Sequence, residues 1–317
     1  MTLAQLVPLI LKISIALLVF TIGLGATPRE LTSLLRRPGK LIGSLVSMNL
    51  VMLVLALAIA LLFPLHRPVK IMLVALALSP VPPILPKRLV KAGGGHDYVM
   101  ALLFSASVFA ILWIPFAGGL LDRMFPADIS IPPLPVAMLV FTTVLGPTLA
   151  GVVVHLLAPS LAQRIASPLA KVATILLVAA AGLMLAKAAP AMLAQIGDGT
   201  LLAIAAFVVL GLAAGQLIGG PEPGDRSVLA LATACRHPAM AMTIARLTAP
   251  EEKAVPAAVL LYLLVSLVVT LPYVAWRKKS LALKAPTPGD PRSVGPAGRG
   301  PGRQDEDLHG PPMTPGR

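Results

Sequence analysis

The chain has 317 residues, of which 57% are hydrophobic and only 12% are charged. Soluble domains contain about 25% charged residues, so this composition excludes an ordinary soluble enzyme. The net charge of +13 comes mainly from basic residues between apolar blocks, a pattern typical of cytoplasmic loops in membrane proteins, and it does not indicate a nucleic-acid partner. The blocks are about 20 residues long, enough for a helix to cross roughly 30 Å of hydrocarbon, and they predict an all-α polytopic membrane protein.

Nine apolar blocks are predicted to span the membrane. They cover residues 3–24, 41–63, 68–86, 97–117, 134–157, 168–189, 199–219, 227–248 and 254–276. Lys and Arg gather after the first, third and ninth blocks, which places these segments in the cytoplasm. We expect residues 1–280 to form a transmembrane domain in the plasma (inner) membrane, with the N-terminus outside and the C-terminus in the cytoplasm. Residues 281–317 are rich in Pro and Gly, and such a tail is expected to be disordered.

The third block contains four prolines, Pro80, Pro82, Pro83 and Pro86. Each proline removes a backbone donor and clashes with the preceding turn, so this stretch cannot be regular helix. Only about 12 residues precede it, too few to cross a bilayer. Freed carbonyls at membrane depth are tolerated only where protein or a water-filled cavity satisfies them. We therefore predict a broken helix in the interior; the alternative is a helix that leaves the membrane at Pro80.

The eighth block carries Arg236, His237 and Pro238 near its middle. At 1.5 Å per residue, Arg236 lies roughly 14 Å along a helix from Ser227. That depth is close to the bilayer centre, where an arginine needs a partner or a wet cavity. We predict a second broken helix with an intramembrane site. The alternative is two short helices joined by a surface loop, with Arg236 snorkelling to the interface. His237 is equally compatible with a packed neutral imidazole and with a pH switch.

The charged residues favour an anionic partner. No acidic residue lies well inside a predicted span, whereas Arg236 does. Carboxylate sodium sites, carboxylate proton relays and aspartyl intramembrane proteases need buried acids, so the sequence predicts no enzyme, no metal site and no cofactor. A guanidinium offers a carboxylate or sulfate two parallel hydrogen bonds. We therefore expect the partners to be the lipid bilayer and a small organic anion.

The positions of the two broken blocks indicate internal symmetry. If the first helix of a ten-helix plan is missing, the third and eighth blocks are each fourth in their half of the chain, and they run in opposite directions. Discontinuous helices at matching positions of two halves are typical of secondary transporters with inverted repeats.

Three segments carry a family resemblance. Residues 20–31 contain Gly-Leu-Gly-Ala-Thr-Pro, residues 35–40 contain Arg-Arg-Pro-Gly, and residues 144–151 contain Gly-Pro-Thr-Leu-Ala-Gly. In this order, and with the eighth block as a crossing helix, residues 1–276 resemble the bile acid:sodium symporter family. The resemblance implies a panel domain, made of spans 1, 5 and 6, and a core domain that rock to give alternating access. It also implies organic anions as substrates, usually driven by Na⁺.

The resemblance implies that the usual sodium sites are lost here. The family's cation-site residues are replaced in this sequence at residues 81–86, Ala101, Ala232, Arg236 and His237. Ser105 retains the hydroxyl found at its position in the family. Ala232 replaces a sodium-ligating Glu, and Arg236-His237 replaces a Gln-Asn pair. We therefore expect Arg236 to stand as a fixed charge in place of a mobile cation, and bound Na⁺ is doubtful.

The combined prediction is a secondary transporter of an organic anion, a carboxylate or sulfate that is bile-acid-like or smaller. The predicted substrate-binding residues are Arg236 as counter-ion, His237, Thr233, Ser105, Pro82 and Pro83. Two alternatives stay open: a non-transporting anion receptor or sensor, and a symporter that still uses Na⁺. The sequence leaves open the substrate, the oligomeric state and the group that partners Arg236 when no substrate is bound.

Overall fold

A computed structural model of the chain describes residues 3–82, 85, 89–90, 95–124 and 133–282. Every regular element within these ranges is helical, which confirms the all-α prediction. The elements are α1 (Leu3–Leu24), α2 (Pro28–Thr32), η1 (Ser33–Arg36), α3 (Pro38–Leu45), η2 (Val46–Val51), α4 (Met52–Leu62), α5 (Arg67–Leu78), α7 (His96–Met124), α8 (Pro133–Val140), η3 (Phe141–Leu145), α9 (Gly146–Leu157), α10 (Pro159–Leu193), α11 (Thr200–Ile218), α12 (Pro223–Ala234), α13 (Pro238–Thr248) and α14 (Val255–Ala282).

The lengths and hydropathy of these helices are those of a multi-pass membrane protein. Seven segments are long and apolar enough to cross a bilayer: Pro38–Leu62, His96–Met124, Ala137–Leu157, Pro159–Leu193, Thr200–Ile218, Pro223–Thr248 and Val255–Ser280. An eighth is added if α1 and α2, which meet at 97°, form one bent span. The multi-pass prediction is therefore confirmed, but the structure has seven or eight candidate spans where nine were predicted. The predicted third span, 68–86, is helical only as far as Leu78, and most of the predicted tail lies outside the described residues.

Local sequence explains where several helices begin. Proline is favoured in the first turn, where its missing N–H costs nothing, and it opens α2, α3, α10, α12 and α13. The sharp bend between α1 and α2 has a second cause. Thr27 and Glu30 form a reciprocal capping box, in which the Thr27 side chain accepts from the Glu30 N–H and the Glu30 carboxylate accepts from the Thr27 N–H. The box satisfies two backbone donors at the start of α2 and ends α1 at this turn.

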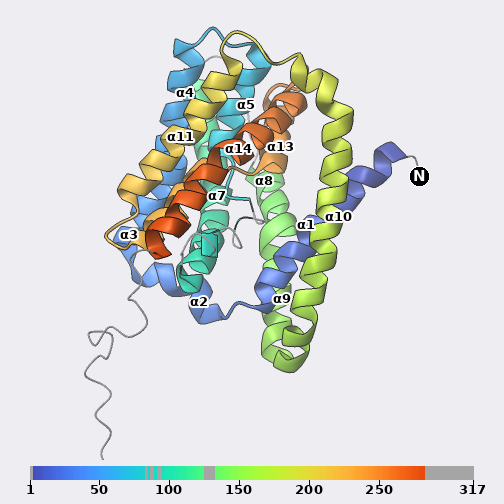
Figure 1. The fold of residues 1–317 in the computed structure, drawn as a ribbon, viewed down its shortest axis with the longest axis vertical. Helices are drawn as coiled ribbons and strands as arrows, with labels where there is room; N and C mark the ends of the chain where they lie inside the picture. Colours follow the sequence, from blue (N-terminus) through green and yellow to red (C-terminus); the bar gives the residue numbers. More distant parts are fainter. Residues whose placement is uncertain (1–2, 83–84, 86–88, 91–94, 125–132, 283–317) are drawn as a thin grey trace, which may run out of the picture.

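The helices form two groups (Figure 1). In the first, α1 packs against α9 and α10. In the second, α5 contacts α4, α13 and α14, while α11 contacts α12 and α14, and the large hydrophobic core belongs mostly to this group. Only 17% of the apolar window of α10 is buried, against 78% for Pro223–Thr248. The α12–α13 segment is therefore the most interior span, and α10 lies at the periphery.

Close backbone approach joins the helices of the first group. A Cβ atom added to Gly23 of α1 would overlap the carbonyl oxygen of Thr148, and one added to Gly151 of α9 would overlap the carbonyl oxygen of Phe20. Helices in a membrane associate through such small-residue contacts because lipid is as apolar as their side chains. The two glycines therefore set the distance between α1 and α9.

Gly23→Ala is expected to destabilise the protein, because the added methyl group forces α1 and α9 apart. Overpacking of this kind costs roughly 1–3 kcal/mol. The matched control is Gly182→Ala on α10, where a Cβ would meet nothing within 4 Å and alanine is the better helix former. Thermal unfolding of both variants in detergent micelles measures the difference. Equal unfolding temperatures for the two variants would contradict the close contact.

Candidate functional site

Two helices end inside the protein and their ends meet. Helix α5 stops at Leu78 and continues in extended conformation at Ser79, while α12 stops at Ala234 before α13 begins at Pro238. The two irregular segments are hydrogen-bonded to each other. The backbone N–H of His237 donates to the Pro80 carbonyl at 2.9 Å and to the Ser79 hydroxyl at 3.1 Å. Both breaks predicted from proline and arginine are therefore present, and they form one crossing.

Arg236 lies at the centre of this crossing, with 1% of its surface exposed. Its Nε donates to the Leu76 carbonyl at 2.9 Å and its Nη2 donates to the Ala77 carbonyl at 2.7 Å. Both carbonyls belong to the last turn of α5, where carbonyls lack intrahelical partners and the helix dipole is negative; the Leu76 carbonyl also accepts from the Ser79 N–H and hydroxyl. The guanidinium therefore caps α5. These carbonyls are the partners of Arg236 that the sequence left open.

Arg236 has no acidic counter-ion in the described part of the chain, and its Nη1 has no hydrogen-bond partner there. The buried acid of the same interior span, Asp225, lies in the first turn of α12 and pairs with Lys40 at 2.6 Å. The hydrogen bonds that the guanidinium makes within the described residues thus go to backbone carbonyls, and one of its nitrogens is left over.

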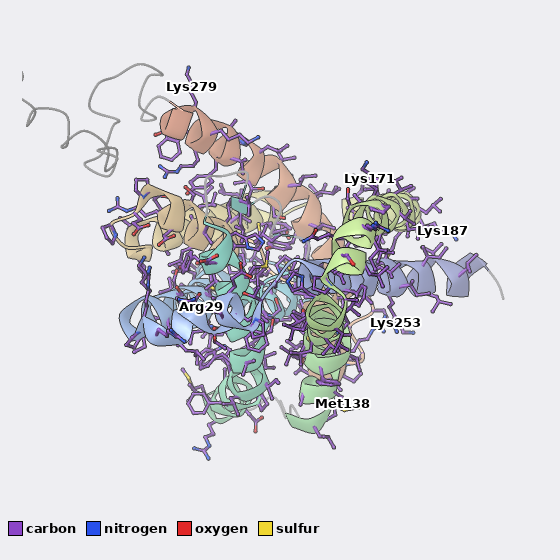
Figure 2. The ribbon with its side chains drawn as sticks, turned by 90° about the horizontal axis from the view of Figure 1, so that it is seen from below. Arg29, Met138, Lys171, Lys187, Lys253 and Lys279 are labelled. Carbon is purple, nitrogen blue, oxygen red and sulfur yellow. The ribbon has the colours of Figure 1, made fainter. Side chains whose placement is uncertain are left out.

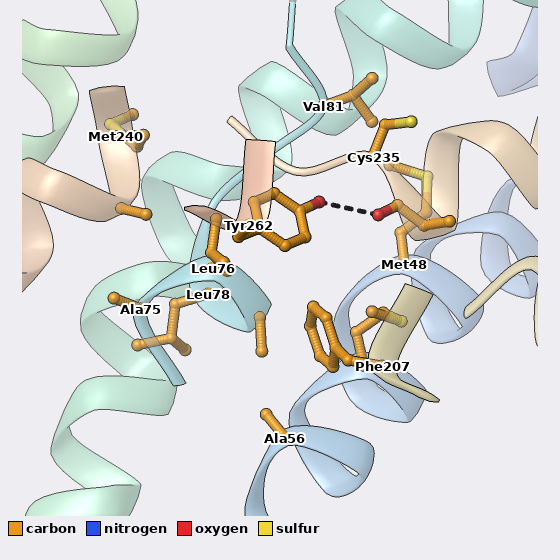
Figure 3. Packing of buried hydrophobic residues seen from close by; sticks show 14 of the residues in the cluster. Met48, Ala56, Ala75, Leu76, Leu78, Val81, Phe207, Cys235, Met240 and Tyr262 are labelled. Atoms are coloured by element: carbon orange, nitrogen blue, oxygen red, sulfur yellow. Dashed lines mark hydrogen bonds between the residues drawn. The ribbon is translucent and has the colours of Figure 1, made fainter. Parts of the chain in front are cut away.

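Tyr262 of α14 completes the crossing (Figure 3). Its hydroxyl donates to the Ala234 carbonyl at 2.8 Å and accepts from the Arg236 N–H at 2.8 Å. Its ring packs edge-on against Phe207 with centroids 6.3 Å apart. Sequence analysis missed this residue. The available signal was a tyrosine in the middle of an apolar block, since a buried tyrosine hydroxyl needs a partner.

The other predicted site residues of the eighth block are also buried. The Thr233 hydroxyl pairs with the Ser47 hydroxyl of η2 at 2.9 Å. The Nδ1 of His237 accepts from the Met240 N–H at 3.5 Å, the outer limit of a hydrogen bond, and its Nε2 has no partner among the described residues. Arg236 and His237 therefore lie together at the crossing, whereas Thr233 faces a neighbouring span.

The predicted residues from other segments are more dispersed. The Pro82 carbonyl accepts from the Leu85 N–H at 3.1 Å, and Pro83 lies outside the described residues. Ser105 of α7 is buried, and its hydroxyl has no partner in the described part of the chain. The next hydroxyl of the same helix, Ser107, bonds back to the Leu103 carbonyl at 2.8 Å.

A small cavity lies beside the crossing, next to the first helix group. It is lined by α1, α2, α7, η3 and α9, together with Val81 of the crossing segment. Val81 directly follows Pro80, whose carbonyl accepts from His237. The only hydroxyls in the lining are those of Ser107 and Thr148, and both donate to the carbonyl four residues earlier, that of Leu103 in α7 and that of Val144 in η3. Its volume of about 20 Å³ has room for roughly one water molecule, so the described conformation is closed.

Comparison with models of known protein families and with curated proteins gives no match for this sequence. The resemblance to the bile acid:sodium symporter family therefore stays a prediction. What is established is a polytopic all-helical membrane protein with seven or eight candidate spans.

Tyr262→Phe is expected to lower the free energy of unfolding by about 1–3 kcal/mol, because it leaves a buried carbonyl and a buried N–H unpaired. Tyr273→Phe on the same helix is the matched control. Its hydroxyl donates to the Gln216 side chain, and both groups are only partly buried. When the hydroxyl is removed, water can therefore hydrogen-bond the Gln216 side chain in its place. Unfolding in detergent compares the two variants, and equal losses would contradict the role of Tyr262.

Proposed function

We propose that the protein is a secondary transporter of an amphipathic organic anion, which works by alternating access. The observation that carries this proposal is the guanidinium of Arg236 on the carbonyls of Leu76 and Ala77 at the crossing of two discontinuous helices. In secondary transporters, the C-terminal ends of broken helices coordinate the coupling cation, and the substrate binds nearby. Arg236 supplies a permanent cation at such a helix end.

The arrangement of the half-helices supports two inverted halves. Arg67, the first residue of α5, forms ion pairs with Glu251 and Glu252, which follow α13. Asp225, in the first turn of α12, pairs with Lys40 of α3. Helices α5 and α12 thus approach the crossing from opposite ends of the molecule, as an inverted repeat requires. With the Lys40 end in the cytoplasm, the basic connections obey the positive-inside rule.

The charge at the crossing supports an anionic substrate. Nη1 of Arg236 and Nε2 of His237 are buried polar atoms without partners among the described residues. A buried donor without a hydrogen-bond partner lowers stability by about 1–3 kcal/mol. An anionic group that enters when the helix groups separate would accept a hydrogen bond from such a donor. Arg236 is the proposed counter-ion. Thr233, His237, Ser105, Pro82 and Pro83 stay its predicted neighbours at the site.

The cavity beside the crossing supports an amphipathic substrate. Its lining is apolar except for Ser107 and Thr148, so it matches the hydrocarbon body of a carboxylated or sulfated molecule rather than a small hydrophilic ion. It lies between the group of α1 and α9 and the helix α7. We propose that these groups move apart to admit substrate, and that the described conformation is the closed intermediate between the two open ones.

Leu103→Trp is expected to reduce uptake of a carboxylated or sulfated sterol by roughly tenfold or more, because the indole fills the cavity through which substrate passes. A loss of about 1.4 kcal/mol in binding free energy lowers affinity tenfold. Leu112→Trp on the same helix is the control, since Leu112 is 71% exposed and Leu103 is 8% exposed. Uptake is measured in liposomes with variants whose unfolding temperatures match. Equal uptake by both variants would place the substrate path elsewhere.

Uptake is expected to be the same in Na⁺ and K⁺ buffers, because Arg236 already occupies the helix end where a coupling cation binds. Arg236→Lys keeps the charge but loses the planar fork, and it is expected to lower uptake without making it depend on Na⁺. The measurement is initial uptake rate by purified protein in liposomes. Clear stimulation by Na⁺ in the unsubstituted protein would refute the role of Arg236 as a fixed cation.

A further inference from the structure

A second, larger pocket lies at the corner where α13 ends and α14 begins. Its volume is about 250 Å³, and its walls combine Met242 and Val255 with the charged side chains of Arg246, Glu252 and Lys253. It is separate from the crossing, because Arg246 lies in the last turn of α13 and His237 lies before the first turn. The proposed transport mechanism makes no use of it.

The charges of this pocket are unbalanced. Glu252 and the neighbouring Glu251 share one arginine, since Arg67 lies 3.3 Å from the first and 3.1 Å from the second. Arg246 and Lys253 are both exposed, and their side chains have no hydrogen-bond or ion-pair partner in the described part of the chain. The positive end of the 28-residue helix α14 faces the same corner and adds to the field. Two cations with no ion-pair partner among the described residues therefore share a concave site with one carboxylate, Glu252, which is already paired with Arg67.

The pocket lies at the ends of two candidate spans, where lipid headgroups are expected. Arg246 belongs to the end of the candidate span Pro223–Thr248, and Lys253 comes directly before the next one, Val255–Ser280. Figure 2 shows Lys253 at the periphery of the helices, where lipid can approach. Exposed Lys and Arg near the membrane surface attract anionic lipid headgroups, and Met242 and Val255 add an apolar part to the pocket wall.

We propose that this pocket binds the phosphate of an anionic phospholipid, with the guanidinium of Arg246 and the ammonium of Lys253 as its ligands. Arginine offers a phosphate two parallel hydrogen bonds, and lysine adds a point charge. A lipid is favoured over a free anion because the site joins two cations at the membrane surface to an apolar wall, which matches a headgroup attached to acyl chains.

The test is thermal unfolding of the full-length protein in a neutral detergent, because a ligand of the folded state raises its unfolding temperature. Three additives are titrated: a phosphatidylglycerol, a phosphatidylcholine with the same acyl chains, and inorganic phosphate. Phosphatidylglycerol is expected to stabilise the protein in a concentration-dependent way. Phosphatidylcholine is expected to be much weaker, because its choline repels the two cations, and phosphate is expected to be weaker because it lacks the acyl chains.

Arg246→Gln and Lys253→Gln are each expected to weaken the effect of phosphatidylglycerol by about tenfold, because a hydrogen bond to a charged group is lost. The double variant is expected to abolish it. The control is Lys187→Gln, which removes an exposed and unpaired lysine from α10. Native mass spectrometry of the same samples counts bound lipid directly, so a variant with lower intrinsic stability is still informative.

Three results would overturn the proposal. Equal stabilisation by phosphatidylcholine would show that the headgroup charge is not recognised. Equal stabilisation by inorganic phosphate would make the pocket a site for soluble anions. Retention of phosphatidylglycerol by the double variant would place the lipid elsewhere on the protein.

Discussion

Backbone carbonyls that a helix leaves unpaired inside a membrane cannot be hydrated, and this constraint organises the protein. Helix α5 ends in the interior because the prolines after Leu78 cannot continue it. Its last carbonyls then require donors from the protein. Arg236 supplies two of them from a segment that lies far away in the sequence. The break in one helix and the charge in another are therefore complementary, since each would be costly without the other.

The same requirement links the crossing to the rest of the second helix group. The Tyr262 hydroxyl hydrogen-bonds both the Ala234 carbonyl at the end of α12 and the N–H of Arg236. These bonds connect α14 to the two broken helices. The first group is joined by the glycine-mediated approach of α1 and α9, and Gly215 brings α11 equally close to Ala230 of α12 in the second group. The cavity that α1, η3 and α9 form with α7 is mostly apolar. We therefore place the proposed motion between these helices.

Much of this architecture could be predicted from patterns that act locally. Apolar block length predicted the bounds of α1, and proline and arginine predicted the two breaks. The predicted sixth span began at 168, whereas α10 begins at Pro159 and includes Pro168. A proline is tolerated inside a transmembrane helix because neighbouring groups satisfy the freed carbonyl, and no local pattern reveals those neighbours. The partner of Arg236 was unpredictable for a related reason, since backbone carbonyls have no side-chain signature.

The hydrogen bonds of the crossing also impose an order on synthesis of the chain. The acceptor carbonyl of Leu76 precedes its donor by 160 residues, and Tyr262 follows Arg236 by another 26. Because chains emerge from the ribosome N-terminus first, α5 enters the membrane long before its cap exists. When Arg236 enters the membrane, its acceptor carbonyls on α5 have already been inserted. The Ala234 carbonyl at the end of α12, however, gains its donor only when α14 is inserted. The interior of this protein is thus completed only when nearly the whole membrane domain has been made.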